Sequence, residues 1–133
     1  MGTRALLHVK EGGLQSQTLI TIYRQYDGYP SGLAMDIFDA LNADKGTTVL
    51  NGFGDHTSPE FFNGMGCLAA FLIGKLKTRI GNIYLYPPDS SDCGEEYTYT
   101  LYQDEQDLKI TWADEYSQVD ILVKSIKDWV KKK

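Results

Sequence analysis

The hydrophobic pattern of this chain changes its period across residues 23–31, and this change constrains the fold more than any other feature. Apolar side chains alternate with their neighbours over residues 5–9, and residues 19–23 are rich in β-branched side chains, so the two segments predict the strands of a hairpin. Over residues 33–41 the apolar side chains instead recur at helical spacing, and Pro30 suits the first turn of that helix. Residues 23–31 therefore carry the chain from a sheet into a helix.

Alternating and β-branched segments elsewhere predict further strands. They lie at residues 47–50, 82–86, 96–102 and 108–112. Together with the hairpin, they predict an α+β fold with a mostly antiparallel or mixed sheet of about five to six strands, packed with two to three helices. The chain has 133 residues and shows no repeat or linker, so we expect a single domain spanning residues 1–133.

Two later segments predict helices. Residues 61–76 are apolar nearly all round, which predicts one central buried helix that begins at Ser58 and Pro59. Residues 119–130 show an amphipathic pattern, which predicts a terminal helix capped by Ser117.

Composition and charge limit the classes of function. Hydrophobic residues make up 42% of the chain and charged residues 23%, as in an ordinary folded protein. The formal net charge of −5 argues against a nucleic-acid binder, which needs a basic surface. The two cysteines lack paired spacing, and the chain shows neither a secretory signal nor an apolar stretch of membrane-spanning length. These features predict a soluble protein of the cytoplasm without a membrane partner.

Nucleophilic catalysis needs a nucleophile next to a base, and the candidates for these roles are His8, His56 and Cys93. Cys93 is predicted to lie in an exposed loop that either histidine can reach. Its neighbours Asp92 and Glu95 are acidic, however, which disfavours a thiolate nucleophile. No spacing joins the candidates into a catalytic pattern, so the question of enzymatic activity stays open and a non-enzymatic protein is favoured.

No metal and no cofactor are expected. The histidines and cysteines lack the paired spacing of zinc ligands. The run Gly64-Met65-Gly66-Cys67-Leu68-Ala69 matches the G-x-G-x-x-A dinucleotide pattern, but a predicted helix start precedes it where a strand is required. Gly64 and Gly66 therefore either mark a break in the helix or let a neighbouring backbone approach closely.

The junction at residues 23–31 holds the candidate binding residues, which are Arg24, Tyr26, Asp27 and Tyr29. Two interpretations are open. In the one that we favour, Arg24 pairs with Asp27 or with a helix terminus, and the tyrosines pack as a corner. In the other, the Arg24 guanidinium and the tyrosine hydroxyls form a recognition lip for a carboxylate or a partner loop.

Tyrosine is the dominant aromatic residue, with nine copies against five Phe and two Trp. In the strand predicted at residues 82–86, Tyr84 and Tyr86 alternate with Ile83 and Leu85, and exposed tyrosines on one face suit a protein interface. We therefore expect a non-enzymatic binding or assembly module that forms a homo-oligomer, in the simplest case a dimer, and that can take a protein partner. The alternative is a small hydrolase or ligand-binding enzyme with its site around residues 23–31.

Three stretches of the chain carry a resemblance to a known group of proteins. They are Met1-Gly2-Thr3-Arg4-Ala5, Thr21-Ile22-Tyr23-Arg24-Gln25-Tyr26-Asp27-Gly28-Tyr29-Pro30 and Asn63-Gly64-Met65-Gly66. In these the chain resembles a family of short proteins, without an established activity, from bacteria, phages and large DNA viruses such as marseilleviruses. The resemblance spans most of the chain. It implies a stand-alone viral accessory or particle protein, located in the host cell or the virion, that needs no cofactor.

Overall fold

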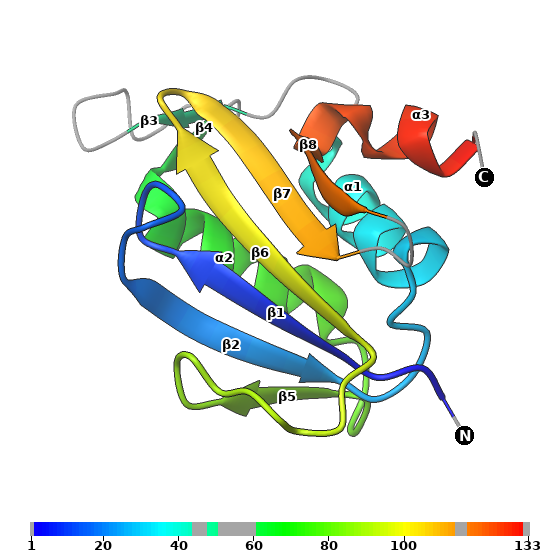
Figure 1. Cartoon of the computed structure of the whole chain (residues 1–133). Coiled ribbons are helices and arrows are strands. Elements are labelled where there is room, and N and C mark those ends of the chain that lie inside the picture. Colours follow the sequence, from blue (N-terminus) through cyan, green and yellow to red (C-terminus); the bar gives the residue numbers. More distant parts are fainter. Residues whose placement is uncertain (1, 44–47, 51–60, 114–116, 132–133) are drawn as a thin grey trace.

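The computed structural model describes residues 2–43, 48–50, 61–113 and 117–131, and within these residues it has an α+β fold (Figure 1). The described strands form one eight-stranded mixed sheet in the order β4-β3-β7-β6-β1-β2-β5, with β8 beside β7. The strands are β1 (Ala5–Lys10), β2 (Thr18–Arg24), β3 (Thr48–Leu50), β4 (Phe61–Asn63), β5 (Ile83–Tyr86), β6 (Tyr97–Asp104), β7 (Asp107–Ala113) and β8 (Gln118–Leu122). The helices are η1 (Pro30–Ala34), α1 (Met35–Leu41), α2 (Gly64–Leu76), η3 (Val123–Ser125) and α3 (Ile126–Lys131).

The sheet is built around the hairpin that the sequence predicts. β1 and β2 pair antiparallel, with Leu7 opposite Ile22. On its other side β1 pairs parallel with β6, and β3 pairs parallel with β4, whereas the remaining neighbours are antiparallel. The prediction of an α+β fold with a mixed sheet is confirmed.

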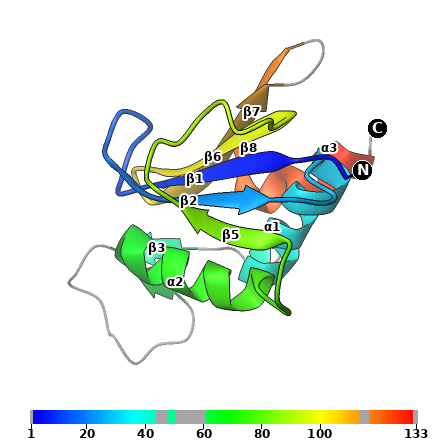
Figure 2. The same cartoon turned by 90° about the horizontal axis from the view of Figure 1, so that it is seen from below.

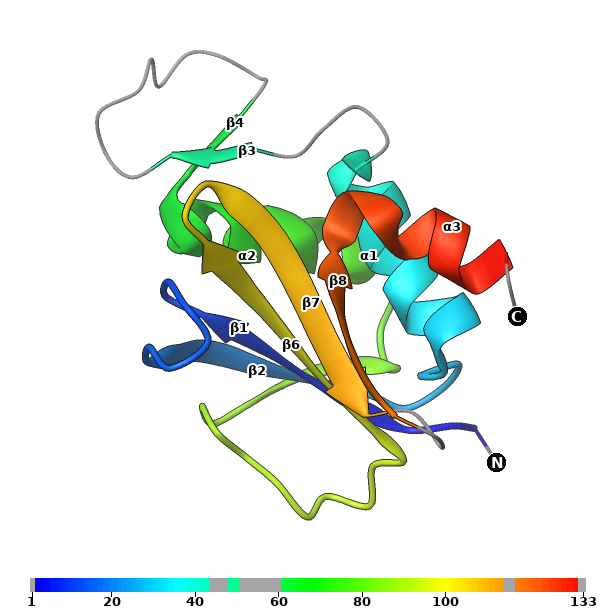
Figure 3. The same cartoon turned by 45° about the horizontal axis from the view of Figure 1, so that its top comes forward.

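The helices cover one face of the sheet, as Figures 1 and 2 show from two directions. A single cluster of buried side chains fills the space between them, to which Leu7 of β1, Ile37 of α1, Leu68 of α2 and Ile126 of α3 contribute. Figure 3 shows α3 lying beside α1. Because side chains alternate along a strand, neighbours of the core residues such as His8 point to the opposite face, which we call the helix-free face.

The helix predicted at residues 61–76 begins later than expected. Residues Phe61–Asn63 form β4, and α2 starts at Gly64, whose φ of 85° lies in the left-handed region that favours glycine. Of the two roles weighed for the glycines, the break in the helix is therefore the correct one at Gly64. Nothing approaches within 4 Å of a methyl group built at Gly66.

Burial on α2 is confined to one side. Met65, Leu68 and Leu72 are buried against the sheet, whereas Cys67 is exposed and Phe71 is 40% exposed. The all-round apolar pattern suggested a helix enclosed on every side, but the described helices form a single layer, and no second layer of described residues covers the outer side of α2.

The predicted terminal helix is wrong over its first half. Residues Gln118–Leu122 form β8, which pairs antiparallel with β7, and α3 covers only Ile126–Lys131. Ser117 therefore precedes a strand and caps no helix. The apolar spacing around Val119 fits both a helix and a strand, and the pairing with β7 favours the strand. A hydrogen bond from the Thr111 hydroxyl of β7 to the Val119 carbonyl, 2.6 Å long, adds to this pairing.

The predicted strand at residues 47–50 is observed as β3, although residue 47 lies outside the described residues. Ser58 and Pro59, which were expected to begin a helix, also lie outside them.

Candidate functional site

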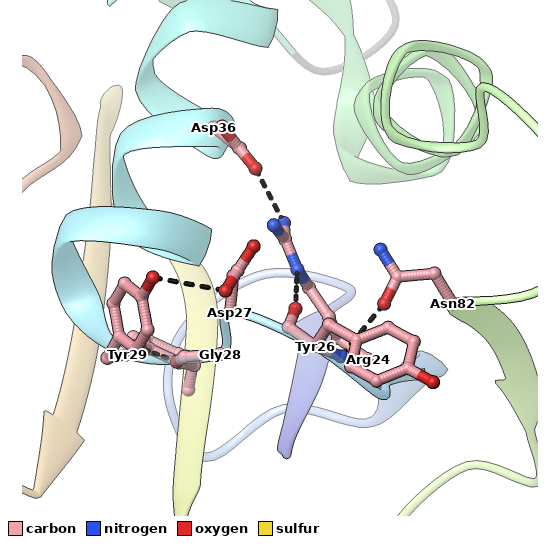
Figure 4. Close-up of polar contacts among 8 residues, drawn as sticks. Arg24, Tyr26, Asp27, Gly28, Tyr29, Asp36 and Asn82 are labelled. Atoms are coloured by element: carbon pink, nitrogen blue, oxygen red, sulfur yellow. Dashed lines mark hydrogen bonds and ion pairs between the residues drawn. The ribbon is translucent and has the colours of Figure 1, made fainter. Parts of the chain in front are cut away.

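Arg24 is the last residue of β2, and its guanidinium is held by two oxygen atoms (Figure 4). Its Nη1 lies 2.7 Å from Asp36 Oδ2 on the first turn of α1, and its Nε donates to the Tyr26 carbonyl at 2.7 Å. The Arg24 side chain is only 9% exposed, whereas that of Asp36 is 46% exposed. The ion-pair partner of Arg24 is thus the carboxylate of Asp36 in α1, and within the described residues no hydrogen bond or ion pair joins Arg24 to Asp27.

Asn82, which immediately precedes β5, forms hydrogen bonds with the junction at residues 23–31. Its Oδ1 accepts a hydrogen bond from the Tyr26 backbone N–H at 2.9 Å, and its carbonyl accepts one from the Gln25 N–H at 2.8 Å. The Tyr26 side chain is 48% exposed and points away from the core contacts of Arg24 (Figure 4). The backbone of Tyr26 is thus fixed on both sides, by Arg24 and by Asn82, while its ring stays accessible.

Asp27 and Tyr29 contact each other at the surface. The Tyr29 hydroxyl donates to Asp27 Oδ1 at 3.0 Å, and this hydrogen bond raises the pKa of Tyr29 above its usual value. Asp27 has a φ of 60°, a left-handed conformation that Asp tolerates better than most residues. This pair is local to the turn and separate from the Arg24 ion pair.

The N-terminus packs into the junction at Gly28. The Gly28 N–H donates to the Thr3 carbonyl at 2.8 Å, and its carbonyl accepts the buried Tyr99 hydroxyl at 2.6 Å. A methyl group at Gly28 would lie 2.6 Å from Ala5 Cβ, so no side chain fits there. The first two stretches that carry the family resemblance are therefore joined in space, and their residues build a tightly packed corner.

A groove of about 400 Å³ lies between α1, the end of α2 and the segment that leads to β5. Its lining residues are Arg24, Asp36, Asp39, Ala40, Lys75, Leu76, Thr78 and Asn82. Of the four predicted binding residues, only Arg24 lines this groove. Tyr26, Asp27 and Tyr29 are not among its lining residues.

His8 lies on the helix-free face, away from the groove. Its Nδ1 is 2.7 Å from the hydroxyl oxygen of Thr21, which also accepts the Asp89 backbone N–H at 3.1 Å. Partial burial lowers the pKa of His8 below its usual value of 6.5, an effect that nearby Asp89 opposes. The hydrogen bond to Thr21 occupies one ring nitrogen of His8.

Cys93 lies between β5 and β6 and is half-buried. Its Sγ lies 3.3 Å from the Ser91 carbonyl, and its backbone N–H donates to Glu95 Oε1 at 2.7 Å. Within the described part of the chain, no hydrogen bond joins Cys93 to His8. His56, the third catalytic candidate, lies outside the described residues.

Several residues that organise these regions were not predicted from the sequence. Asp36 is one of these, because its pairing with Arg24 depends on how α1 packs beside the end of β2. Asn82 accepts a hydrogen bond from the Tyr26 N–H, and the Lys77 ammonium donates to the carbonyls of Gly81 and Ile83. The sequence does not indicate these contacts, because only the fold brings the backbone atoms near the two side chains.

No described helix is long and apolar enough to cross a membrane. Among the residues that the structure describes, no three His, Cys, Asp or Glu side chains are grouped so that they could hold a metal ion. No family model matches the chain, and no curated protein and no solved structure matches it.

Proposed function

We propose that the protein is a non-enzymatic binding or assembly module that self-associates through its β5 edge. The observation that carries this proposal is the exposure of β5, which ends the sheet order and has no neighbouring strand on its outer side within the described residues. Edge strands present unpaired backbone groups to other chains, and folded proteins usually protect them with charged side chains or proline. β5 itself, Ile83–Tyr86, carries no charged side chain.

Large apolar side chains gather at this edge. Tyr84 is 46% exposed, Leu85 is 62% exposed and Ile80, just before the strand, is 98% exposed. By contrast, Tyr99 is fully buried and Tyr102 is 6% exposed, so they belong to the interior. Tyr26 and Tyr29 are also exposed, but they lie in the turn after β2, whereas Tyr84 lies on a strand at the open edge of the sheet and therefore suits an interface.

The polar candidates support binding over catalysis. Arg24 is engaged by Asp36 and the Tyr26 carbonyl, so its guanidinium already has structural partners. His8 and Cys93 each contact other groups, and no hydrogen bond joins the two within the described residues. A nucleophile–base pair requires such a contact.

The resemblance to short proteins of phages and large DNA viruses extends the proposal to an accessory or particle role. Such a role needs a surface that holds protein copies together and needs no reaction centre. The β5 edge is the surface that we assign to it.

The groove beside Arg24 favours a second candidate, a small hydrolase or ligand-binding enzyme. Its volume of about 400 Å³ suits a small ligand, and the carboxylates of Asp36 and Asp39 both line it. Screening of ester and small-ligand panels, with Asp39→Asn as the comparison variant, tests this candidate. Turnover or saturable binding that Asp39→Asn abolishes would favour it over the assembly module.

Light scattering coupled to size exclusion, run over a series of protein concentrations, tests the assembly proposal. We expect a dimer or larger species whose fraction rises with concentration. Leu85→Ser should shift the dissociation constant upward by about tenfold, since it removes an exposed apolar side chain from the edge. Leu14→Ser is the matched control, because Leu14 is also 40% exposed but lies between β1 and β2. A monomer at every concentration refutes the proposal.

A further inference from the structure

The outer side of β5 has a defined set of unpaired backbone groups. The Gln25 N–H donates to the Asn82 carbonyl at 2.8 Å, which fixes the direction of the backbone groups along the β2–β5 ladder. Backbone groups alternate between the two sides of an antiparallel strand, so those of Ile83 and Leu85 point outward.

Ile83 is already satisfied within the chain. Its N–H donates to the Gly81 carbonyl at 2.7 Å, and its own carbonyl accepts the Lys77 Nζ at 2.8 Å. Leu85 has no such partner for its outward N–H and carbonyl among the described residues. The free part of the edge is therefore centred on Leu85.

We propose that a second copy of this chain pairs antiparallel with β5 about a two-fold axis at Leu85. The inference rests on the proposed function, because it names the partner and the register of that self-association. In this register Leu85 exchanges its N–H and carbonyl with Leu85 of the partner subunit, so both outward groups are satisfied. Any register that uses Ile83 would first have to break its bonds to Gly81 and Lys77.

The side chains match in this register. Tyr84 lies opposite Tyr86 of the partner subunit, which continues the row of tyrosine rings on the helix-free face, where Tyr23 already stacks on Tyr86 with centroids 5.0 Å apart. Leu85 and the partner's Leu85 meet on the other face. Ile83 lies opposite the partner's Pro87, which has no N–H to donate. The carbonyl of Ile83 does not require a donor from the partner, because it already accepts a hydrogen bond from Lys77 Nζ.

The charges at the two ends of β5 favour a second copy over an unrelated strand. Lys77 and Arg79 precede the strand and are exposed, and Asp89 follows it and is exposed. An antiparallel two-fold pair brings the basic end of one β5 alongside the acidic end of the other. A second copy of this chain therefore offers an acidic group to the basic end of β5 and a basic group to its acidic end.

Cysteine pairing tests the register. In a background with Cys67→Ala and Cys93→Ser, Tyr84→Cys and Tyr86→Cys are made as separate proteins. Residues opposite each other at a non-hydrogen-bonded position have Cα atoms about 4.5 Å apart, which is within disulfide range. We expect a mixture of the two proteins to oxidise to a crosslinked dimer, and each protein alone to stay largely uncrosslinked.

Charge reversal tests the choice of partner. Arg79→Glu and Asp89→Lys should each raise the dimer dissociation constant about tenfold, and the double variant should restore it, because among the described residues neither side chain takes part in the contacts that shape the β5 edge. If the protein dimerises but the mixture does not crosslink, or the double variant is no better than the singles, this inference fails while the proposed function stands. If the wild-type protein is a monomer throughout, the proposed function itself fails.

Discussion

Arg24 connects β2 to α1 through its contacts with Asp36 and the Tyr26 carbonyl, and its replacement by Met removes both while keeping most of the buried stem. A hydrogen bond between charged groups contributes about 1.5–3 kcal/mol, and a carbonyl left without its donor costs about 1 kcal/mol more. Asp36 is 46% exposed, so solvent weakens the ion pair and the lower half of the range applies. We expect Arg24→Met to lower the free energy of unfolding by about 2.5–3 kcal/mol.

A double-mutant cycle isolates the ion pair. Asp36→Asn leaves the Arg24 guanidinium, 9% exposed, without its counter-charge, and the cycle with Arg24→Met should give a coupling energy of about 1–2 kcal/mol in urea unfolding. The control is the pair of Lys109 and Asp120, whose charged atoms lie 3.7 Å apart at side chains that are 23% and 42% exposed. Its coupling should stay below about 1 kcal/mol. Equal coupling in both pairs, or an Arg24→Met variant as stable as the wild type, would refute the reasoning.

Two further changes test the corner and the helix-free face. Gly28→Ala places a methyl group 2.6 Å from Ala5 Cβ and should destabilise the fold by about 1–3 kcal/mol, whereas Gly66→Ala, with open space around it, should stabilise it by up to about 1 kcal/mol; denaturant unfolding of both variants decides. The folded state lowers the pKa of His8, so the unfolded state binds more protons below pH 6.5 and stability should fall as the pH drops through that value. His8→Gln should flatten this part of the stability profile between pH 7.5 and 5.5, and an unchanged slope would show that burial does not shift the titration of His8.

The spacing of apolar residues predicted those elements whose pattern fits either a strand or a helix, but not both. Residues 5–9 alternate and residues 33–41 repeat at helical spacing, and both were predicted correctly, with Leu7 and Ile37 buried in the core as their patterns indicate. Residues 118–122 fit both a helix and a strand, and only the proximity of β7 decides in favour of β8. Short apolar segments of this kind cannot be assigned without their neighbours.

The candidate site likewise combines features that the local sequence predicted with contacts that depend on distant segments. The sequence placed Arg24 and Asp27 in a structural corner, and Arg24 does hold that corner, but its partner is Asp36 on the following helix. The edge character of β5 could not be predicted at all, because strand order depends on which distant segments pair. Lys77, which satisfies the carbonyl of Ile83, is recognisable only once that order is known.

The parallel pairing of β1 with β6 has a consequence for how the chain folds as it leaves the ribosome. β1 is synthesised before the other described strands, yet one of its two neighbours in the sheet is made only after β2, α1, α2 and β5. The β1–β2 hairpin must therefore wait, with one edge open, until residues 97–104 emerge. Pairing between segments so far apart slows folding and lengthens the time for which that edge is exposed to other nascent chains. A fragment that stops before β6 lacks the strand that completes the centre of the sheet.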